Sequence, residues 1–326
     1  MLPNWSTIAN PRYSQPETSY PRTMLVIETF RGSERESVHR VLAAHCDTDG
    51  RLIHESEPGA GSWRFFLRSA AKPFQAAPAV AEGVIDTLGL TSQHLAVACS
   101  SHDGSERYTR LVREILESAG LDEAALQTGS DGQGTPIQHQ CSGNHALGLA
   151  WAAVRGWPTA SYCVAENPVQ QGMNAAVAQA VGAEVMIAPD NCGMSTHQMT
   201  LSNAATAFAR LASPEADTFL EGLGTVAAAM RRHPELIRPR GQIDAELMAT
   251  DPQLVAKVGA EAALGIGHSD LGGIALRVLD GGTRAWGPAG SAVAAEWFST
   301  DSTGLEQPAL LDAHGRPIGH TAARWE

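Results

Sequence analysis

Short blocks of apolar residues near the N-terminal end of the chain predict β-strands over residues 24–30, 40–46 and 63–67. Residues 47–50 have the sequence Asp-Thr-Asp-Gly, which is typical of a turn. Residues 51–55 are therefore expected to return beside the second strand and complete a hairpin. The first part of the chain is predicted to form antiparallel sheet.

The middle of the chain changes to helical spacing. Apolar side chains three and four positions apart predict a helix over residues 105–118, and Gly120 is a plausible end for it. Alanine-rich stretches further along predict buried helices that pack through small side chains. The other expected helices cover residues 76–85, 145–154, 169–181 and 201–211. Two short apolar blocks, 94–99 and 185–188, are interpreted as strands.

Strand character returns near the C-terminal end, over residues 273–279. A turn at Asp280-Gly281-Gly282 then predicts a second hairpin, whose return strand is 283–286, followed by a helix over 289–298. Strands at both ends with helices between them predict an α+β fold, with a sheet built from both termini and a helical middle. Residues 24–326 are expected to form a single domain, preceded by a proline-rich N-terminal arm over residues 1–23.

The composition narrows the class of protein. The net charge of −12 over 326 residues argues against a nucleic-acid partner or an anionic membrane surface. Five cysteines form an odd set without close pairing, which favours a reduced, cytoplasmic protein over a disulfide framework. The first residues contain no apolar run typical of a signal peptide, and no segment approaches the ~20 apolar residues of a membrane span.

Lysine is nearly absent from the chain. Of the 23 Lys and Arg residues only Lys72 and Lys257 are lysines, which leaves 23 − 2 = 21 arginines. A guanidinium stays protonated in proteins, whereas a lysine can be tuned into a neutral base. Two retained lysines therefore indicate a site that needs a proton acceptor, although compositional drift would also leave a few lysines behind.

The first lysine belongs to a Ser-x-x-Lys pattern. Ser69 and Lys72 stand one helical turn apart, after a predicted strand and just before Pro73, which the first turn of a helix tolerates. In Ser-x-x-Lys enzymes the serine attacks an acyl carbon and the lysine assists. Lowering a lysine pKa from about 10.4 to ~7 costs about 4–5 kcal/mol. A second ammonium nearby, that of Lys257, would repel the charged form of Lys72 and account for part of this shift.

Two loops carry further reactive groups. Ser101, in Ser101-His102-Asp103-Gly104, is either a hydroxyl that relays protons or part of a loop that caps the next helix. Cys141 and Cys192 each lie in a glycine-containing loop, near His145 and Asp190 respectively. Thiols in such loops bind zinc, but free cysteines are also commonly buried, so both interpretations stay open.

Taken together, these segments resemble the Rhizobium-type (class 3, thermolabile) L-asparaginases, the asparaginase II family. The matching segments occur in the family's order and span roughly residues 24–300. They are Glu36-Ser37-Val38-His39-Arg40, Arg68-Ser69-Ala70-Ala71-Lys72-Pro73, Ser101-His102-Asp103-Gly104, Cys141-Ser142-Gly143, Glu166-Asn167-Pro168-Val169-Gln170, Asp190-Asn191-Cys192-Gly193 and Lys257-Val258-Gly259-Ala260-Glu261.

The resemblance implies an αβα sandwich akin to glutaminases and serine β-lactamases, and a homodimer. It implies two Ser–Lys pairs, Ser69 with Lys72 and Ser101 with Lys257. It also implies zinc held by Cys141, Cys192 and a lysine three positions after the first cysteine.

This chain departs from the family at that third zinc ligand, where it has Asn144. An amide oxygen is a poor zinc ligand beside thiolates. Either zinc binds more weakly through the two cysteines with water or His145, or the metal has been lost and Asn144 contacts the substrate.

The sequence thus predicts a hydrolase of the side-chain amide of L-asparagine that uses a serine acyl-enzyme and no organic cofactor. Ser69 would attack and Lys72 accept its proton, while Ser101 and Lys257 complete the proton relay. Candidate substrate-binding residues are Arg68, His102, Asn144 and Asp190. The alternatives are another ω-amide such as glutamine, a β-lactam-like substrate, or a non-catalytic amino-acid binder.

Overall fold

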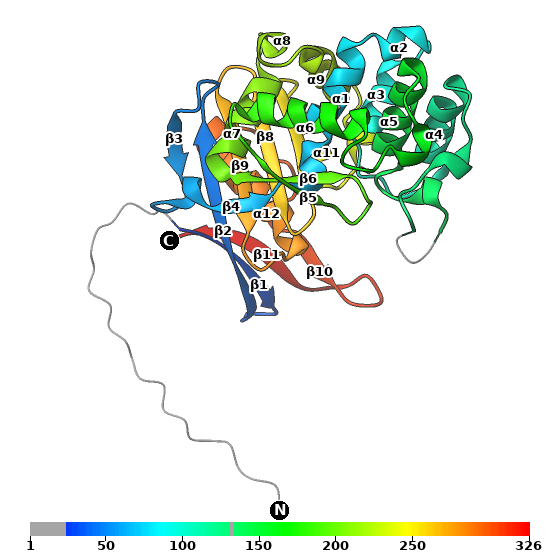
Figure 1. Ribbon diagram of the computed structural model, residues 1–326. Coiled ribbons are helices and arrows are strands. Elements are labelled where there is room, and N and C mark those ends of the chain that lie inside the picture. Colours follow the sequence, from blue (N-terminus) through cyan, green and yellow to red (C-terminus); the bar gives the residue numbers. More distant parts are fainter. Residues whose placement is uncertain (1–23, 131–133) are drawn as a thin grey trace, which may run out of the picture.

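The computed structural model describes residues 24–130 and 134–326 (Figure 1). The expected N-terminal arm, residues 1–23, lies outside the described residues. The larger of two sheets has the strand order β10-β11-β1-β2-β9-β8-β7, with β3 paired to β2. Its strands are β1 (Leu25–Arg31), β2 (Glu34–Cys46), β3 (Leu52–Glu55), β7 (Leu254–Gly259), β8 (Ala263–His268), β9 (Gly272–Val278), β10 (Ala309–Leu311) and β11 (Pro317–Trp325).

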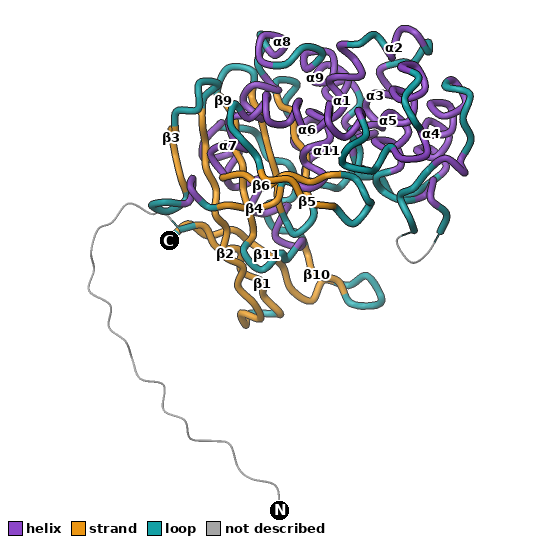
Figure 2. The backbone as a smooth tube through the Cα atoms, viewed as in Figure 1, coloured by secondary structure: helices purple, strands orange, loops and turns teal. Residues whose placement is uncertain are grey.

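This strand order joins the two ends of the chain. β1 lies between β2 and β11 and pairs antiparallel with both, and β9 lies between β2 and β8 (Figure 2). The sheet is therefore assembled from N-terminal and C-terminal strands. The helices come mostly from the segment between β4 and β7, so the expected α+β fold is confirmed.

Helices cover both faces of the large sheet. A Cβ at Gly265 of β8 would lie 2.0 Å from the ring of Phe208, so this face packs against α7 (Leu201–Ala212). The side chain of the neighbouring Leu264 points to the opposite face of the sheet, because successive side chains of a strand alternate. A Cβ at Gly290 of α12 (Trp286–Phe298) would lie 2.8 Å from Leu264. The sheet therefore lies between α7 and α12 as the middle layer of an αβα sandwich.

A second group of helices extends beyond α7, away from the large sheet (Figure 1). A small sheet of order β4-β6-β5 contacts α6 and α7 through its central strand. The remaining elements are β4 (Arg64–Phe66), β5 (Met186–Pro189), β6 (Ser195–Thr200), α1 (Lys72–Ala81), α2 (Val84–Thr87), α3 (Ser92–Ala98), α4 (Glu106–Ser118), α5 (Ser142–Arg155), α6 (Pro168–Val181), α8 (Ala216–Phe219), α9 (Leu223–Arg232), α10 (Pro234–Ile237) and α11 (Ile243–Thr250). Among the described residues, no helix is long and apolar enough to cross a membrane.

Two element predictions are wrong. Residues 94–99 belong mostly to α3, whose start is fixed by a capping box between Thr91 and His94. A short apolar block does not distinguish a buried helix from a strand. Residues 283–286 form a 3₁₀ turn and the start of α12 instead of a return strand. β9 is already paired on both edges, so no edge was left for a hairpin partner.

Candidate active site

Ser69 lies at a tight connection between β4 and α1. The residue before it, Arg68, has φ +54°, a left-handed conformation that is uncommon for residues other than glycine. The Arg68 N–H donates a hydrogen bond to Thr196 Oγ1 (3.1 Å), which fixes the turn. Gly259 permits the turn to approach β7, since a Cβ there would lie 2.2 Å from the Leu67 carbonyl oxygen. Such strained connections often carry functional groups.

Lys72 is buried directly after this turn. Its Nζ donates hydrogen bonds to the carbonyl oxygens of Ser100 (2.5 Å) and Gln140 (3.3 Å). Both contacts are to backbone oxygens that can only accept a hydrogen bond. Ser69 Oγ lies 3.9 Å from Cys141 Sγ, and within the described parts of the chain no hydrogen bond joins Ser69 to Lys72. Proton transfer from Ser69 to Lys72 stays a prediction.

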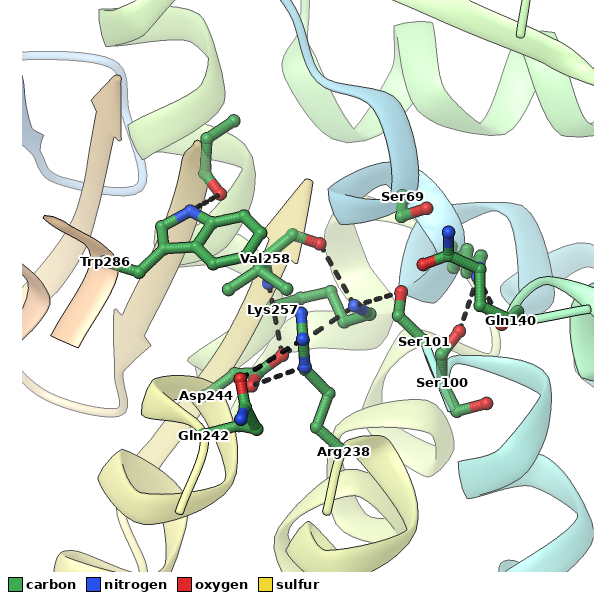
Figure 3. A network of polar contacts seen from close by, with 12 residues as sticks. Ser69, Ser100, Ser101, Gln140, Arg238, Gln242, Asp244, Lys257, Val258 and Trp286 are labelled. Atoms are coloured by element: carbon green, nitrogen blue, oxygen red, sulfur yellow. Dashed lines mark hydrogen bonds and ion pairs between the residues drawn. The ribbon is translucent and has the colours of Figure 1, made fainter. Parts of the chain in front are cut away.

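The second Ser–Lys pair is in direct contact. Lys257, on β7, donates hydrogen bonds to Ser101 Oγ (2.8 Å) and to the Val258 carbonyl oxygen (3.0 Å). Its side chain is fully buried, and Figure 3 shows it between Asp244 and Ser101. A loop after α3 and β7, the strand at one end of the large sheet, therefore bring together two residues that are 156 positions apart.

Burial shifts the protonation of Lys257. Loss of water around the ammonium is the main cause that lowers its pKa to about 7, and the positive charges of Lys72 and Arg238 lower it further. The carboxylate of Asp244, 3.7 Å from Nζ, opposes this shift. About half of the lysine is then neutral at pH 7, compared with almost none of a lysine in water.

Three residues around this lysine were missed in the sequence. Asp244 is fully buried, and Arg238 Nε lies 3.8 Å from its Oδ1. The Arg238 guanidinium stacks 5.3 Å above the ring of Trp286, whose indole N–H donates to the Ala263 carbonyl oxygen. A carboxylate within an apolar helical segment was the one available signal for Asp244, because charged residues are rarely buried without a partner.

A cavity of about 130 Å³ joins both serines. Ser69 and Ser101 line it, as do Arg68, Asp190 and Arg238. Arg68 donates from Nε (2.9 Å) and Nη2 (2.6 Å) to Asp190 Oδ1, so two of the predicted substrate-binding residues form an ion pair at the wall. This wall presents one positive and one negative group, which suits the carboxylate and ammonium of a free amino acid.

The other two predicted substrate-binding residues lie differently. His102 accepts a hydrogen bond from the Gly104 N–H at Nδ1, so its Nε2–H donates to Ser142 Oγ (2.9 Å). Burial is the main cause that lowers the His102 pKa to about 4 and keeps the ring neutral. Asn144 is buried in α5 and lines neither of the cavities beside Ser101, as far as the described residues define them.

The two loop cysteines lie together, as a shared metal site would require. The Cys192 thiol donates a hydrogen bond to Cys141, which lowers the Cys141 pKa and raises that of Cys192. Within residues 24–130 and 134–326, however, no three His, Cys, Asp or Glu side chains are grouped as a metal site would need. His145 Nδ1 is bonded to the Tyr162 hydroxyl (2.7 Å). Two thiols alone are an incomplete ligand set for zinc, and zinc binding stays a prediction.

Searches of known proteins give distant structural matches. The native form of Mglu is 17% identical, with a TM-score of 0.38, and the match covers 79% of this chain and 65% of Mglu. A β-lactamase from Mycobacterium bovis is 14% identical, with a TM-score of 0.39 and coverage of 85% and 96%. No curated protein matches the sequence.

The family comparison covers nearly the whole chain. The family model of L-asparaginase II matches residues 27–322, a span that contains both Ser–Lys pairs, both loop cysteines and the Arg68–Asp190 ion pair. The chain therefore belongs to the L-asparaginase II family.

Proposed function

We propose that this protein hydrolyses the side-chain amide of L-asparagine to L-aspartate and ammonia through a serine acyl-enzyme. One observation carries the proposal: a buried lysine, Lys257, with a pKa near 7, is hydrogen-bonded to Ser101 in a cavity that Ser69 also lines. A neutral lysine beside a hydroxyl can accept a proton at working pH, which serine nucleophiles require.

In the first step Ser69 Oγ bonds to the carboxamide carbon, and its proton passes by way of Ser101 to neutral Lys257. The C–N bond then breaks, and the proton returns to the nitrogen, so that ammonia leaves. Water attacks the resulting ester, gives its proton to the same lysine and releases aspartate, while Ser69 recovers its hydrogen. The Ser69 backbone N–H, at the start of the turn into α1, is a candidate for stabilising the oxyanion.

In this proposal Lys72 stays charged. Its two carbonyl contacts hold it in place, and its positive charge helps to keep Lys257 neutral. The sequence interpretation, in which Lys72 takes the proton of Ser69, requires the side chain to leave at least one carbonyl contact. The contact between Lys257 and Ser101 needs no such rearrangement.

The charged wall of the smaller cavity supports a free amino acid as the substrate. Arg68 would bind the α-carboxylate and Asp190 the α-ammonium, so the ion pair between them gives way to two contacts with substrate. Asparagine is proposed over glutamine because the chain belongs to the L-asparaginase II family. Homodimer formation, a cytoplasmic location and zinc binding remain predictions from the sequence.

The proposal is tested by measuring ammonia release from asparagine and glutamine, and ring opening of a β-lactam panel by absorbance, for wild type, Ser69→Ala and Ser101→Ala. Mass spectrometry of quenched turnover should find a protein adduct of aspartyl mass, and peptide mapping should place it on Ser69. An adduct on Ser101 would reverse the roles of the two serines. Absence of any amide hydrolysis by the folded protein would leave the non-catalytic amino-acid binder as the remaining alternative.

Zinc binding has a separate test, which is metal analysis of protein purified without chelator. Asn144→Lys restores the third ligand of the family pattern and is expected to raise zinc content. Asn144→Gln is the matched control, because it enlarges the side chain without supplying an amine. Equal metal content in all three proteins would contradict the assignment of Cys141 and Cys192 to a zinc site.

A further inference from the structure

A second, larger cavity of about 430 Å³ adjoins the proposed catalytic cavity. The two share four lining residues, which are Ser101, His139, Gln140 and Arg238. Ser69 lines only the smaller cavity and Ser101 lines both. The serine that attacks thus lies on the inner side, and the serine that handles the proton lies on the boundary.

This placement orients the scissile bond, and the argument rests on the proposed function. The acyl carbon lies at Ser69, and the leaving nitrogen must receive its proton from the Ser101–Lys257 pair. The leaving nitrogen therefore lies on the side of Ser101, which opens into the larger cavity. Ammonia leaves most of that volume unused, so the leaving group can be much larger than ammonia.

The larger cavity is polar and carries both charges. Arg238 stands on the shared boundary, and Asp103 lines the outer part together with Thr135, Gln138 and Gln242. Arg238 Nη2 donates to Gln242 Oε1 (3.2 Å), and its Nε is buried against Asp244 Oδ1 (3.8 Å), so the donors available to a ligand are the remaining N–H groups at the end of the guanidinium. A guanidinium with spare donors next to a carboxylate suits the carboxylate and amine of an α-amino acid.

We propose that the enzyme also hydrolyses β-aspartyl dipeptides, in which the side-chain amide nitrogen of asparagine belongs to a second amino acid. Ser69 Oγ bonds to the aspartyl carbonyl carbon, the C–N bond breaks, and the serine proton passes to the nitrogen. The second amino acid leaves through the larger cavity with its carboxylate at Arg238. Water then hydrolyses the same aspartyl ester as in the asparagine reaction.

The experiment compares L-asparagine, β-aspartylglycine and β-aspartylglycine amide by aspartate release, the product common to all three. The dipeptide is expected to be cleaved, with a kcat/KM at least tenfold above that of its amide, which lacks the carboxylate. This comparison needs no mutation, so a folding defect cannot explain it.

Filling the larger cavity gives the second arm. Thr135→Trp should lower kcat/KM for the dipeptide at least tenfold and leave asparagine hydrolysis within threefold of wild type, and Thr135→Ser is the matched control. Hydrolysis of asparagine without hydrolysis of the dipeptide would overturn this inference and leave the proposed function intact. If the folded wild-type protein hydrolyses neither asparagine nor the dipeptide, both this inference and the proposed function are overturned. Equal rates for the dipeptide and its amide would remove Arg238 as the carboxylate contact and overturn the proposed binding mode.

Discussion

The two lysines of this chain occupy contrasting environments a short distance apart. Lys72 is buried at the start of α1 and donates to two backbone carbonyl oxygens. Lys257 is buried on β7, donates to a serine hydroxyl and one carbonyl oxygen, and lies 3.7 Å from a fully buried carboxylate. Both side chains are buried, yet among the described residues only Lys257 has a hydrogen bond to a serine hydroxyl.

The Ser-x-x-Lys spacing alone therefore does not identify which of the two lysines accepts the proton. One helical turn brings Ser69 and Lys72 close along the chain, but Lys72 donates its hydrogen bonds to two backbone carbonyl oxygens. The contact between Ser101 and Lys257 depends on tertiary packing, and burial lowers the Lys257 pKa to about 7. We therefore expect the first lysine to supply charge and the second to move protons.

The largest effect is expected from Lys257→Arg. A guanidinium stays protonated at any working pH, and loss of a general base costs ~10²–10⁴-fold in rate. The variant should lose at least about 10² in kcat for asparagine while circular dichroism shows it folded. Lys257→Met is the companion variant, since it fits the buried site without a charge. Turnover near that of wild type in either folded variant would contradict the role of Lys257.

Substitution of Lys72 separates charge from proton transfer. Lys72→Arg keeps the charge, so kcat should fall less than tenfold, whereas Lys72→Met removes it. Because the charge of Lys72 lowers the Lys257 pKa, its loss should raise that pKa and move the acidic limb of the kcat/KM profile to higher pH. A loss of two orders of magnitude in folded Lys72→Arg would instead make Lys72 the proton acceptor, as the sequence predicted.

Asp244→Asn should move the same limb in the opposite direction. The Asp244 carboxylate favours the charged form of Lys257 and raises its pKa, so a neutral amide lowers it. The variant should keep activity to lower pH than wild type. Asp251→Asn is a suitable control, since Asp251 belongs to the end of the same helix and pairs with His268 instead. An unchanged profile would mean that Lys257 does not control the acidic limb.

The smallest effect concerns stability. The Lys257 pKa is lowered from 10.5 in the unfolded chain to about 7 in the folded protein, so between these values the unfolded state binds more protons. Stability from this group therefore rises with pH across that window, by up to about 1.4 kcal/mol per pH unit. Urea unfolding at pH 7.5 and 9.5 should show this rise in wild type and less of it in Lys257→Met. If the free energy of unfolding changes equally with pH in wild type and Lys257→Met, Lys257 is charged across this pH range in the folded protein.

Much of the fold was determined by local sequence. The apolar blocks at 24–30 and 40–46, and the turn at Asp47–Gly50, predicted the strands that became β1, β2 and β3. The alanine-rich stretches became α5, α6 and α7 for the same reason, since their small residues permit close packing. The secondary structure of residues 283–286 could not be predicted from local sequence, because it depends on whether β9 has a free edge.

The candidate site likewise depends partly on local sequence and partly on tertiary structure. Residue types and spacing made Ser69, Lys72 and Lys257 candidates, because few other side chains can attack an acyl carbon or accept its proton. Ser101 and its pairing with Lys257 came from the resemblance to the family. The sequence could not decide which lysine is neutral. That depends on desolvation and on Asp244 and Arg238, which only the packing of α11 and the loop before it against β7 brings to Lys257. The sequence determines which side chains are present, whereas the protonation state of a lysine depends on its burial and on the charges that the tertiary structure places around it.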